Sequence, residues 1–157
     1  MSIDALSIVR KGLQEYADRG VFRGFGEVKG ARGKAGFNFV WLGNRLLNVT
    51  LDEKKGVLRF NNLLPNISSD SILYEDLKRF LKSRSDRKTP RHRRVEAHRA
   101  ELSWINRGGN ISIALTIKNN QYAYGLNRLV NLVHEIFVHL SDSYSDYLCE
   151  NFDAPQE

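Results

Sequence analysis

The fold class of this chain is decided by the segment Gly109-Asn-Ile-Ser-Ile-Ala-Leu-Thr-Ile-Lys118. Large apolar residues alternate with small or polar ones: Ile111, Ile113, Leu115 and Ile117 against Ser112, Ala114 and Thr116. Because successive side chains of a strand point to opposite faces of a sheet, this pattern predicts a strand with one buried and one open face. The pair Gly108-Gly109 is typical of a two-residue hairpin turn and predicts a partner strand over residues 100–106.

Three more strands are predicted upstream, over residues 37–42, 46–51 and 57–62. Gly43-Asn44 favours a tight hairpin between the first two, and Gly56 suits the left-handed position of a longer hairpin loop between the second and third. The stretch before them, residues 21–36, is rich in glycine and basic residues. We interpret it as a short strand or an extended loop.

Apolar residues at three- and four-residue spacing predict helices over about residues 3–17, 69–82 and 120–140, the last one capped by Asn120. A break at residues 141–143 precedes a short helix with Tyr144, Tyr147 and Leu148. The main elements follow the order α-β-β-β-α-β-β-α. We therefore expect a single α+β domain over residues 1–157, with an antiparallel sheet of about five strands and the helices on one face.

Charge is placed unevenly along the chain, whose formal net charge is +6. Residues 78–99 hold ten Lys and Arg against Asp86 and Glu96, a local charge of +8, and no Lys or Arg follows Arg128. Pro90 interrupts this region, and we expect a loop or arm over about residues 83–99, called the basic segment below. Its candidate binding residues are Arg87, Lys88, Arg91, Arg93 and Arg94, which suit phosphates, an acidic partner surface or the acidic C-terminal region of a second copy. A solvated loop without a dedicated partner is the alternative.

Two motifs suggest a bound metal or cofactor, but the first has the wrong spacing and the second lies between the wrong secondary-structure elements. In His134-Glu-Ile-Phe-Val-His139 the histidines are five residues apart, whereas a zinc-binding helix of this kind needs four. Gly24-Phe-Gly26-Glu-Val-Lys-Gly30 follows a predicted helix and precedes a strand, the reverse of a dinucleotide-binding loop. We therefore expect no metal, no cofactor and no catalytic site, so that the protein is not an enzyme.

Phe37, Phe39 and Trp41 share one face of a predicted strand. Aromatic residues in this arrangement stack on bases in RNA-recognition motifs, but the strand and helix that should precede that motif are missing here. We expect the three rings to pack as core under the helices.

Composition indicates a cytoplasmic protein. Hydrophobic residues make up 41% and charged residues 27% of the chain, and no apolar run is long enough to span a bilayer. The first ten residues do not resemble a secretory signal, and Cys149 has no second cysteine for a disulfide. We expect no contact with a membrane.

The order of the elements resembles the type III secretion chaperone-like fold, which bacterial sensory-transduction-regulator-like proteins share. The resemblance is strongest at residues 45–52 with their return strand 56–60, and at residues 109–116 leading into the last helix. It implies a homodimer that holds segments of partner proteins without catalysis.

Two functions follow as expectations. The first is a non-catalytic, homodimeric, chaperone-like adaptor that binds a protein or peptide partner through the open side of the last hairpin: Ser103, Ser112, Ala114 and Thr116. The alternative is a module that binds nucleic acid or another polyanion through residues 78–99.

Overall fold

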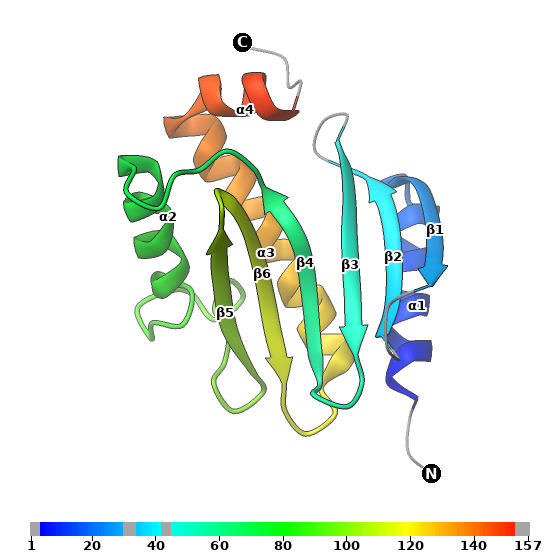
Figure 1. Cartoon of the computed structure of the whole chain (residues 1–157). Coiled ribbons are helices and arrows are strands. Elements are labelled where there is room, and N and C mark those ends of the chain that lie inside the picture. The colour runs from blue at the N-terminus through cyan, green and yellow to red at the C-terminus, as the bar shows by residue number, and fades with distance from the viewer. Residues whose placement is uncertain (1–3, 30–33, 42–44, 153–157) are drawn as a thin grey trace.

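The computed structural model describes residues 4–29, 34–41 and 45–152 (Figure 1). In chain order, these residues form α1 (Ala5–Asp18), β1 (Arg23–Lys29), β2 (Lys34–Val40), β3 (Leu46–Asp52), β4 (Val57–Leu64), α2 (Ile72–Ser83), β5 (Ala100–Arg107), β6 (Asn110–Ile117), α3 (Tyr122–Ser143) and α4 (Ser145–Phe152). The hairpin turn expected at Gly43-Asn44 lies outside the described residues.

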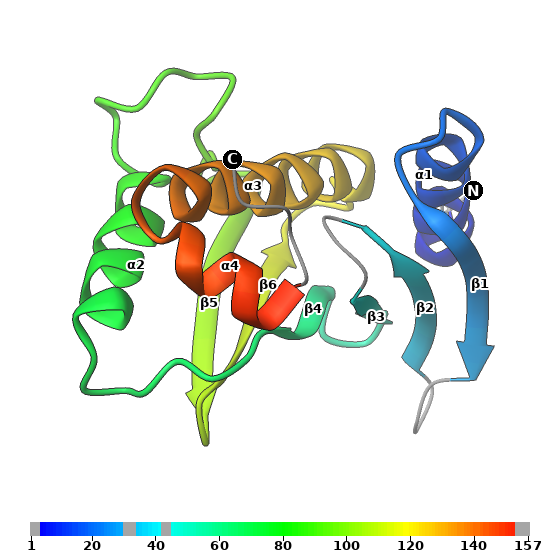
Figure 2. The same cartoon turned by 90° about the horizontal axis from the view of Figure 1, so that it is seen from above.

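One antiparallel sheet organises the described chain, with the strand order β1-β2-β3-β4-β6-β5. The helices α1, α2 and α3 lie on one side of it, as the view from above shows (Figure 2). No described element covers the other side, which is called the open face below. The expected α+β class, with an antiparallel sheet and helices on one face, is confirmed.

The sheet has six described strands rather than the expected five, because residues 21–36 contribute β1 and the beginning of β2. β1 is an edge strand that pairs with β2 through a register shift between Arg23 and Gly26. Its place is set by Phe25, whose ring stacks on Phe37, and by Glu27, which forms an ion pair of 2.5 Å with Arg10 of α1. Glycine has low strand propensity, which hid this strand in the sequence.

The side chains of β6 alternate between the two faces of the sheet, as predicted. Ile111, Ile113 and Leu115 are fully buried between the sheet and the helices, whereas Ser112 and Thr116 face the other side and are half-buried. Phe37 and Phe39 are also fully buried, and Trp41 packs against the same core. The prediction that these aromatic residues form core is confirmed, and they are not a surface for stacking bases.

The β5–β6 hairpin closes as predicted through Gly108 and Gly109, whose φ angles are 61° and 90°. Side chains with a Cβ are disfavoured in this left-handed region, so two consecutive glycines suit the turn. On the other side of β6, the ladder with β4 shifts register between Phe60 and Leu64. There the backbone N–H of Asn62 donates to the Ser112 Oγ at 2.9 Å, so this hydroxyl replaces a lost ladder bond.

Two helix starts differ from the expected ones by a few residues. Ser71 caps α2 through a hydrogen bond from the Tyr74 N–H to its Oγ, so the helix begins at Ile72 rather than near residue 69. Asn120 has a φ of 57° and does not cap α3, which begins after Gln121 without a side-chain cap. The break between α3 and α4 falls at Tyr144 rather than at residues 141–143.

Because β6 is fully buried on only one face, substitutions on its two faces should differ in their effect on stability. Ile113→Asp should unfold the protein at neutral pH, because an unpaired carboxylate in an apolar core costs several kcal/mol. Thr116→Asp should change the free energy of unfolding little, because this side chain faces the open side of the sheet. Urea denaturation followed by circular dichroism measures both. Equal destabilisation by the two variants would mean that both faces of the sheet are covered.

Candidate functional site

The basic segment connects α2 to β5 as a succession of hydrogen-bonded turns. The Val95 N–H donates to the Arg84 carbonyl at 2.7 Å, which joins the two ends of the loop. Between them, the Arg93 N–H donates to the Pro90 carbonyl at 2.9 Å. Val95 is 3% exposed and belongs to the hydrophobic core. The segment is a loop, as expected; its two ends are joined and its last residues contact the core, whereas residues 85–88 and 90–93 are exposed.

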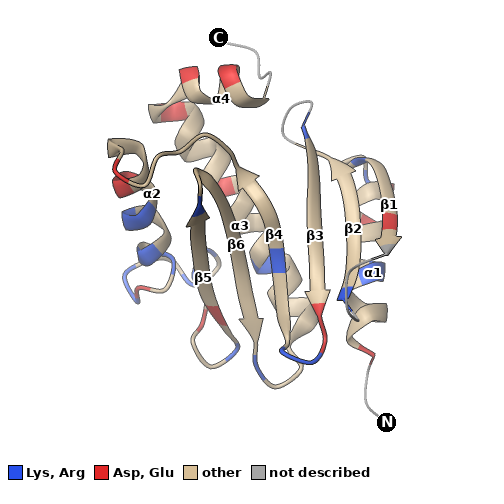
Figure 3. Ribbon diagram, viewed as in Figure 1, with Lys and Arg blue, Asp and Glu red and all other residues tan. Residues whose placement is uncertain are grey.

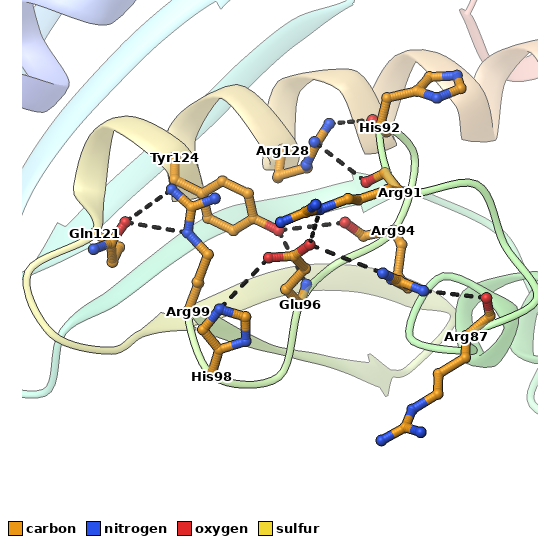
Figure 4. A network of polar contacts seen from close by, with 10 residues as sticks. All are labelled: Arg87, Arg91, His92, Arg94, Glu96, His98, Arg99, Gln121, Tyr124 and Arg128. Carbon is orange, nitrogen blue, oxygen red and sulfur yellow. Dashed lines mark hydrogen bonds and ion pairs between the residues drawn. The ribbon is translucent and has the colours of Figure 1, made fainter.

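Tyr124 of α3 lies at the centre of the contacts between the segment and the helix (Figure 4). Its hydroxyl accepts the Glu96 N–H at 3.0 Å and donates to the Arg94 carbonyl at 3.3 Å. The Arg99 guanidinium lies 3.7 Å from the centre of its ring, and that of Arg128 lies 5.3 Å from it. The ring therefore lies close to two cations while its hydroxyl fixes the backbone of the segment.

Arg128 of α3 binds the segment through backbone carbonyls instead of a carboxylate. Its guanidinium donates to the carbonyl of His92 and, at 3.4 Å, to that of Arg91. Its Nε is buried and has no hydrogen-bond partner among the described residues. A charge held by carbonyls in this way ties the turn at residues 91–92 to α3.

Glu96 is the carboxylate at the core of the segment, and its side chain is 9% exposed. It forms an ion pair of 2.8 Å with Arg91 and lies 3.9 Å from Arg94 and 3.6 Å from His98. The hydrogen bond from Arg91 holds the pKa of Glu96 below its ordinary value, and nearby charges add to this effect. One acid thus organises cations from both sides of it in the sequence.

Glu135 is the first of the six acidic residues that follow Arg128 and form the acidic C-terminal region of the chain. It contacts the basic segment. Its carboxylate lies 2.7 Å from Arg84 and 3.8 Å from Arg93. Asp153 and Glu157, which belong to the same acidic region, lie outside the described residues. Attraction between the two regions therefore exists within one subunit, through α3.

The predicted binding cations fall into two groups. Arg87 and Lys88 are exposed, and their side chains form no hydrogen bond or ion pair with another described residue. The side chains of Arg91 and Arg93 are 81% and 57% exposed in spite of their ion pairs. Arg94 is different: its side chain is 23% exposed and donates to the Arg87 carbonyl at 3.1 Å. Four cations thus face solvent, and Arg94 supports the loop.

The other predicted site residues, Ser112, Ala114 and Thr116, lie on the open face, so the structure does not bring the two groups together. Ala114 is 3% exposed, because Arg59 and Ser103 flank it in register. Ser112 is engaged with the β4 backbone, as described above. Of these three, Thr116 is the residue that keeps a half-exposed polar group without a described partner.

An amide network on the open face was missed in the sequence. The Asn48 side chain donates to the Asn38 Oδ1 at 2.7 Å, and that of Asn61 donates to the Asn48 Oδ1 at 2.8 Å and the Thr50 Oγ1 at 3.0 Å. Asparagine at polar positions of three adjacent strands was the available signal. Arg59, next to this network in register, forms no hydrogen bond or ion pair with a described residue.

Of the two histidines of α3, His139 is engaged with α2. His139 Nε2 lies 3.0 Å from the Asp76 Oδ2 of α2, and its ring stacks on Phe80. Among the described residues, no group of three or more His, Cys, Asp or Glu side chains is placed to hold a metal ion. His139 therefore contributes to the packing of α2 on α3.

Comparisons of the chain with known protein families, with curated proteins and with solved structures find no match. The resemblance to the type III secretion chaperone-like fold stays a prediction. In the part of the chain that the structure describes, no helix is both long and apolar enough to cross a membrane.

Limited proteolysis tests whether Arg128 anchors the basic segment to α3. Arg128→Met keeps the length of the side chain but loses hydrogen bonds worth about 1–2 kcal/mol in total. Trypsin cleavage within the basic segment should then become about 5 to 30 times faster, since transient opening of the loop exposes the sites. Arg79→Met, at an exposed position of α2 with a contact of 3.8 Å to Asp76, is the control. Equal cleavage rates for the two variants would show that Arg128 does not anchor the segment.

Proposed function

We propose that the protein binds nucleic acid through the exposed cations of the basic segment. The observation that carries this proposal is that some cations of the segment stabilise the protein, whereas others are left exposed to solvent. Arg84, Arg94, Arg99 and Arg128 are engaged with the protein itself, whereas Arg87 and Lys88 have no described side-chain partner. Arg91 and Arg93 form ion pairs with Glu96 and Glu135, but their side chains stay mostly exposed. Lys and Arg gather on this loop and on the adjoining α2 (Figure 3).

The guanidinium groups favour phosphate as the ligand. Three of the four exposed cations are arginines, whose planar fork of N–H donors matches two oxygens of one phosphate. Because the loop is already ordered in the free protein, binding costs less conformational entropy than it would for a disordered arm. These two properties support a specific phosphate-binding surface over a merely solvated loop.

An acidic protein is a weaker candidate for this surface, because protein interfaces are anchored by buried aromatic or aliphatic residues. The large apolar side chains exposed on the described residues are Val21, Val28, Leu46, Ile72, Ile105 and Val138. None of them belongs to residues 84–99. Val138 of α3 lines a pocket together with Arg84 and Arg93, but one exposed valine is a small anchor. A surface dominated by cations suits the electrostatic binding of a nucleic-acid backbone.

The salt dependence of binding tests the proposal. The double variant Arg87→Ala/Lys88→Ala removes two cations that have no structural contact. It should bind single- or double-stranded DNA more weakly and reduce the slope of log affinity against log salt by about 1.4 to 1.8, the release expected from two phosphate contacts. Fluorescence anisotropy between about 50 and 200 mM salt covers the useful range.

The matched control is Lys54→Ala/Lys55→Ala, which removes two exposed cations from the β3–β4 turn. It lowers the net charge by the same amount. An equal loss of affinity in both double variants would mean that net charge, and not the basic segment, attracts the DNA. No binding by the unmodified protein would contradict the proposed function outright.

The open face favours a second candidate, a homodimeric adaptor that binds other proteins. Its central residues in β3, β4 and β6 are asparagine, serine, threonine and alanine, with Arg59 as the charged exception. Interfaces are depleted of charged residues in this way. The free edge of β5, Ala100–Arg107, also offers unpaired backbone groups to an added strand.

Analytical ultracentrifugation tests the homodimer. If two open faces pack together, the unmodified protein should sediment with twice the mass of one chain. Thr116→Arg should shift it to the mass of a single chain, because the substitution brings an unpaired charge into the contact. A single-chain mass for the unmodified protein at all accessible concentrations would contradict the homodimer.

A further inference from the structure

A cavity of about 270 Å³ lies within the basic segment and opens to solvent. Its polar lining comes from Ser85 and Arg87 at one end of the loop and from Arg94, Glu96 and His98 at the other. The Val95 N–H bond to Arg84 holds these two ends together. Figure 4 shows His98 and Arg94 on either side of Glu96, with the Arg87 side chain lower in the view.

Positive charge prevails around this cavity. Arg87 and Arg94 contribute two guanidinium groups. Glu96 is the one acid in the lining, and its charge is already compensated by Arg91 at 2.8 Å. An anion placed in the cavity therefore meets more positive than negative charge.

Hydrogen-bond donors are also available there. An arginine side chain carries five N–H donors, and those of Arg87 bind no described residue. The Ser85 hydroxyl has no described partner either. Arg94 is held in place by its Nη1 bond to the Arg87 carbonyl, which leaves the other side of its guanidinium directed toward Glu96. The lining thus offers the unused donors of Arg87 and Ser85 beside the partly engaged guanidinium of Arg94.

We propose that this cavity binds the terminal phosphate of a nucleic-acid strand; the proposal rests on the nucleic-acid binding proposed above. A terminal phosphate monoester carries about −1.5 to −2 charge at neutral pH and three strong acceptor oxygens. An internal phosphodiester has one charge and two free oxygens. Two guanidinium groups, an imidazole and a hydroxyl around one small cavity match the terminal group better. The remaining exposed cations, Lys88, Arg91 and Arg93, would contact the adjoining backbone.

Anisotropy with three short single-stranded DNAs of one sequence tests the inference. One has hydroxyl groups at both ends, one a 5′-phosphate and one a 3′-phosphate. One of the phosphorylated strands should bind about tenfold more tightly than the hydroxyl-ended strand, as expected for added hydrogen bonds to a charged group. An excess of inorganic phosphate should remove this preference.

Equal affinity for all three strands would overturn the terminal-phosphate site and leave the proposed function standing. Absence of binding to any strand would overturn both. The two failures are therefore distinguishable.

The variant Arg87→Lys links the preference to the cavity. It keeps the charge but loses the fork, so the ratio of affinities between the phosphorylated and hydroxyl-ended strands should fall several-fold. Arg107→Lys, the same change at an exposed position of the β5–β6 hairpin, should leave this ratio unchanged. An unchanged ratio in Arg87→Lys would contradict the placement of the phosphate in this cavity.

Discussion

The packing of α3 across the sheet is the constraint on which the rest of the structure depends. One side of this helix places Leu129, Val133 and Ile136 in the core. The helix also lies so close to β6 that a Cβ on Gly125 would come 2.2 Å from the Ile117 side chain. This close approach fixes the position of Tyr124, Arg128 and Glu135, the three residues that α3 presents to the basic segment. The same helix therefore stabilises the hydrophobic core and orders the charged loop.

Ordering a loop with so many cations requires that their mutual repulsion be offset. The protein does this with a carboxylate at each side of the loop, Glu96 and Glu135, and with backbone carbonyls bound by Arg94 and Arg128. Exposed ion pairs stabilise a protein by only about 0–1 kcal/mol each. The contacts of the half-buried Tyr124 and the buried Val95 are thus essential to the order of the loop. Cations that these contacts do not use stay available to an external anion.

Much of the fold was predictable because it is periodic. The period of two in β6 and the period near 3.6 in the helices each repeat a signal several times, so that single exceptions do not hide it. β1 was predicted only as one of two alternatives, a short strand or an extended loop, because glycines replace the alternating side chains that mark a strand. The start of α3 was misplaced because asparagine is a common N-cap residue, whereas Asn120 has a left-handed backbone conformation and does not cap the helix.

The candidate site was predictable only in part, and for a physical reason. Charge density identified the basic segment and Arg87, Lys88, Arg91, Arg93 and Arg94 within it. It gave no sign that Arg94 supports the loop or that Tyr124 and Arg128 take part. The hydrogen bonds of Tyr124 and Arg128 with the segment join residues 28 to 37 positions apart and have no periodic pattern. The separation of the basic segment from Ser112, Ala114 and Thr116 likewise depends on which face of the sheet the helices cover.

Hydrogen exchange at the Glu96 amide tests the central claim, that α3 holds the basic segment in one ordered arrangement. This N–H donates to the Tyr124 hydroxyl, and its protection therefore reports the contact itself. We predict that it exchanges far more slowly than in an unstructured peptide, and that Tyr124→Phe brings it close to the unstructured rate while the Ile113 amide in β6 stays protected. Exchange of the Glu96 amide at the unstructured rate in the unmodified protein would contradict the account.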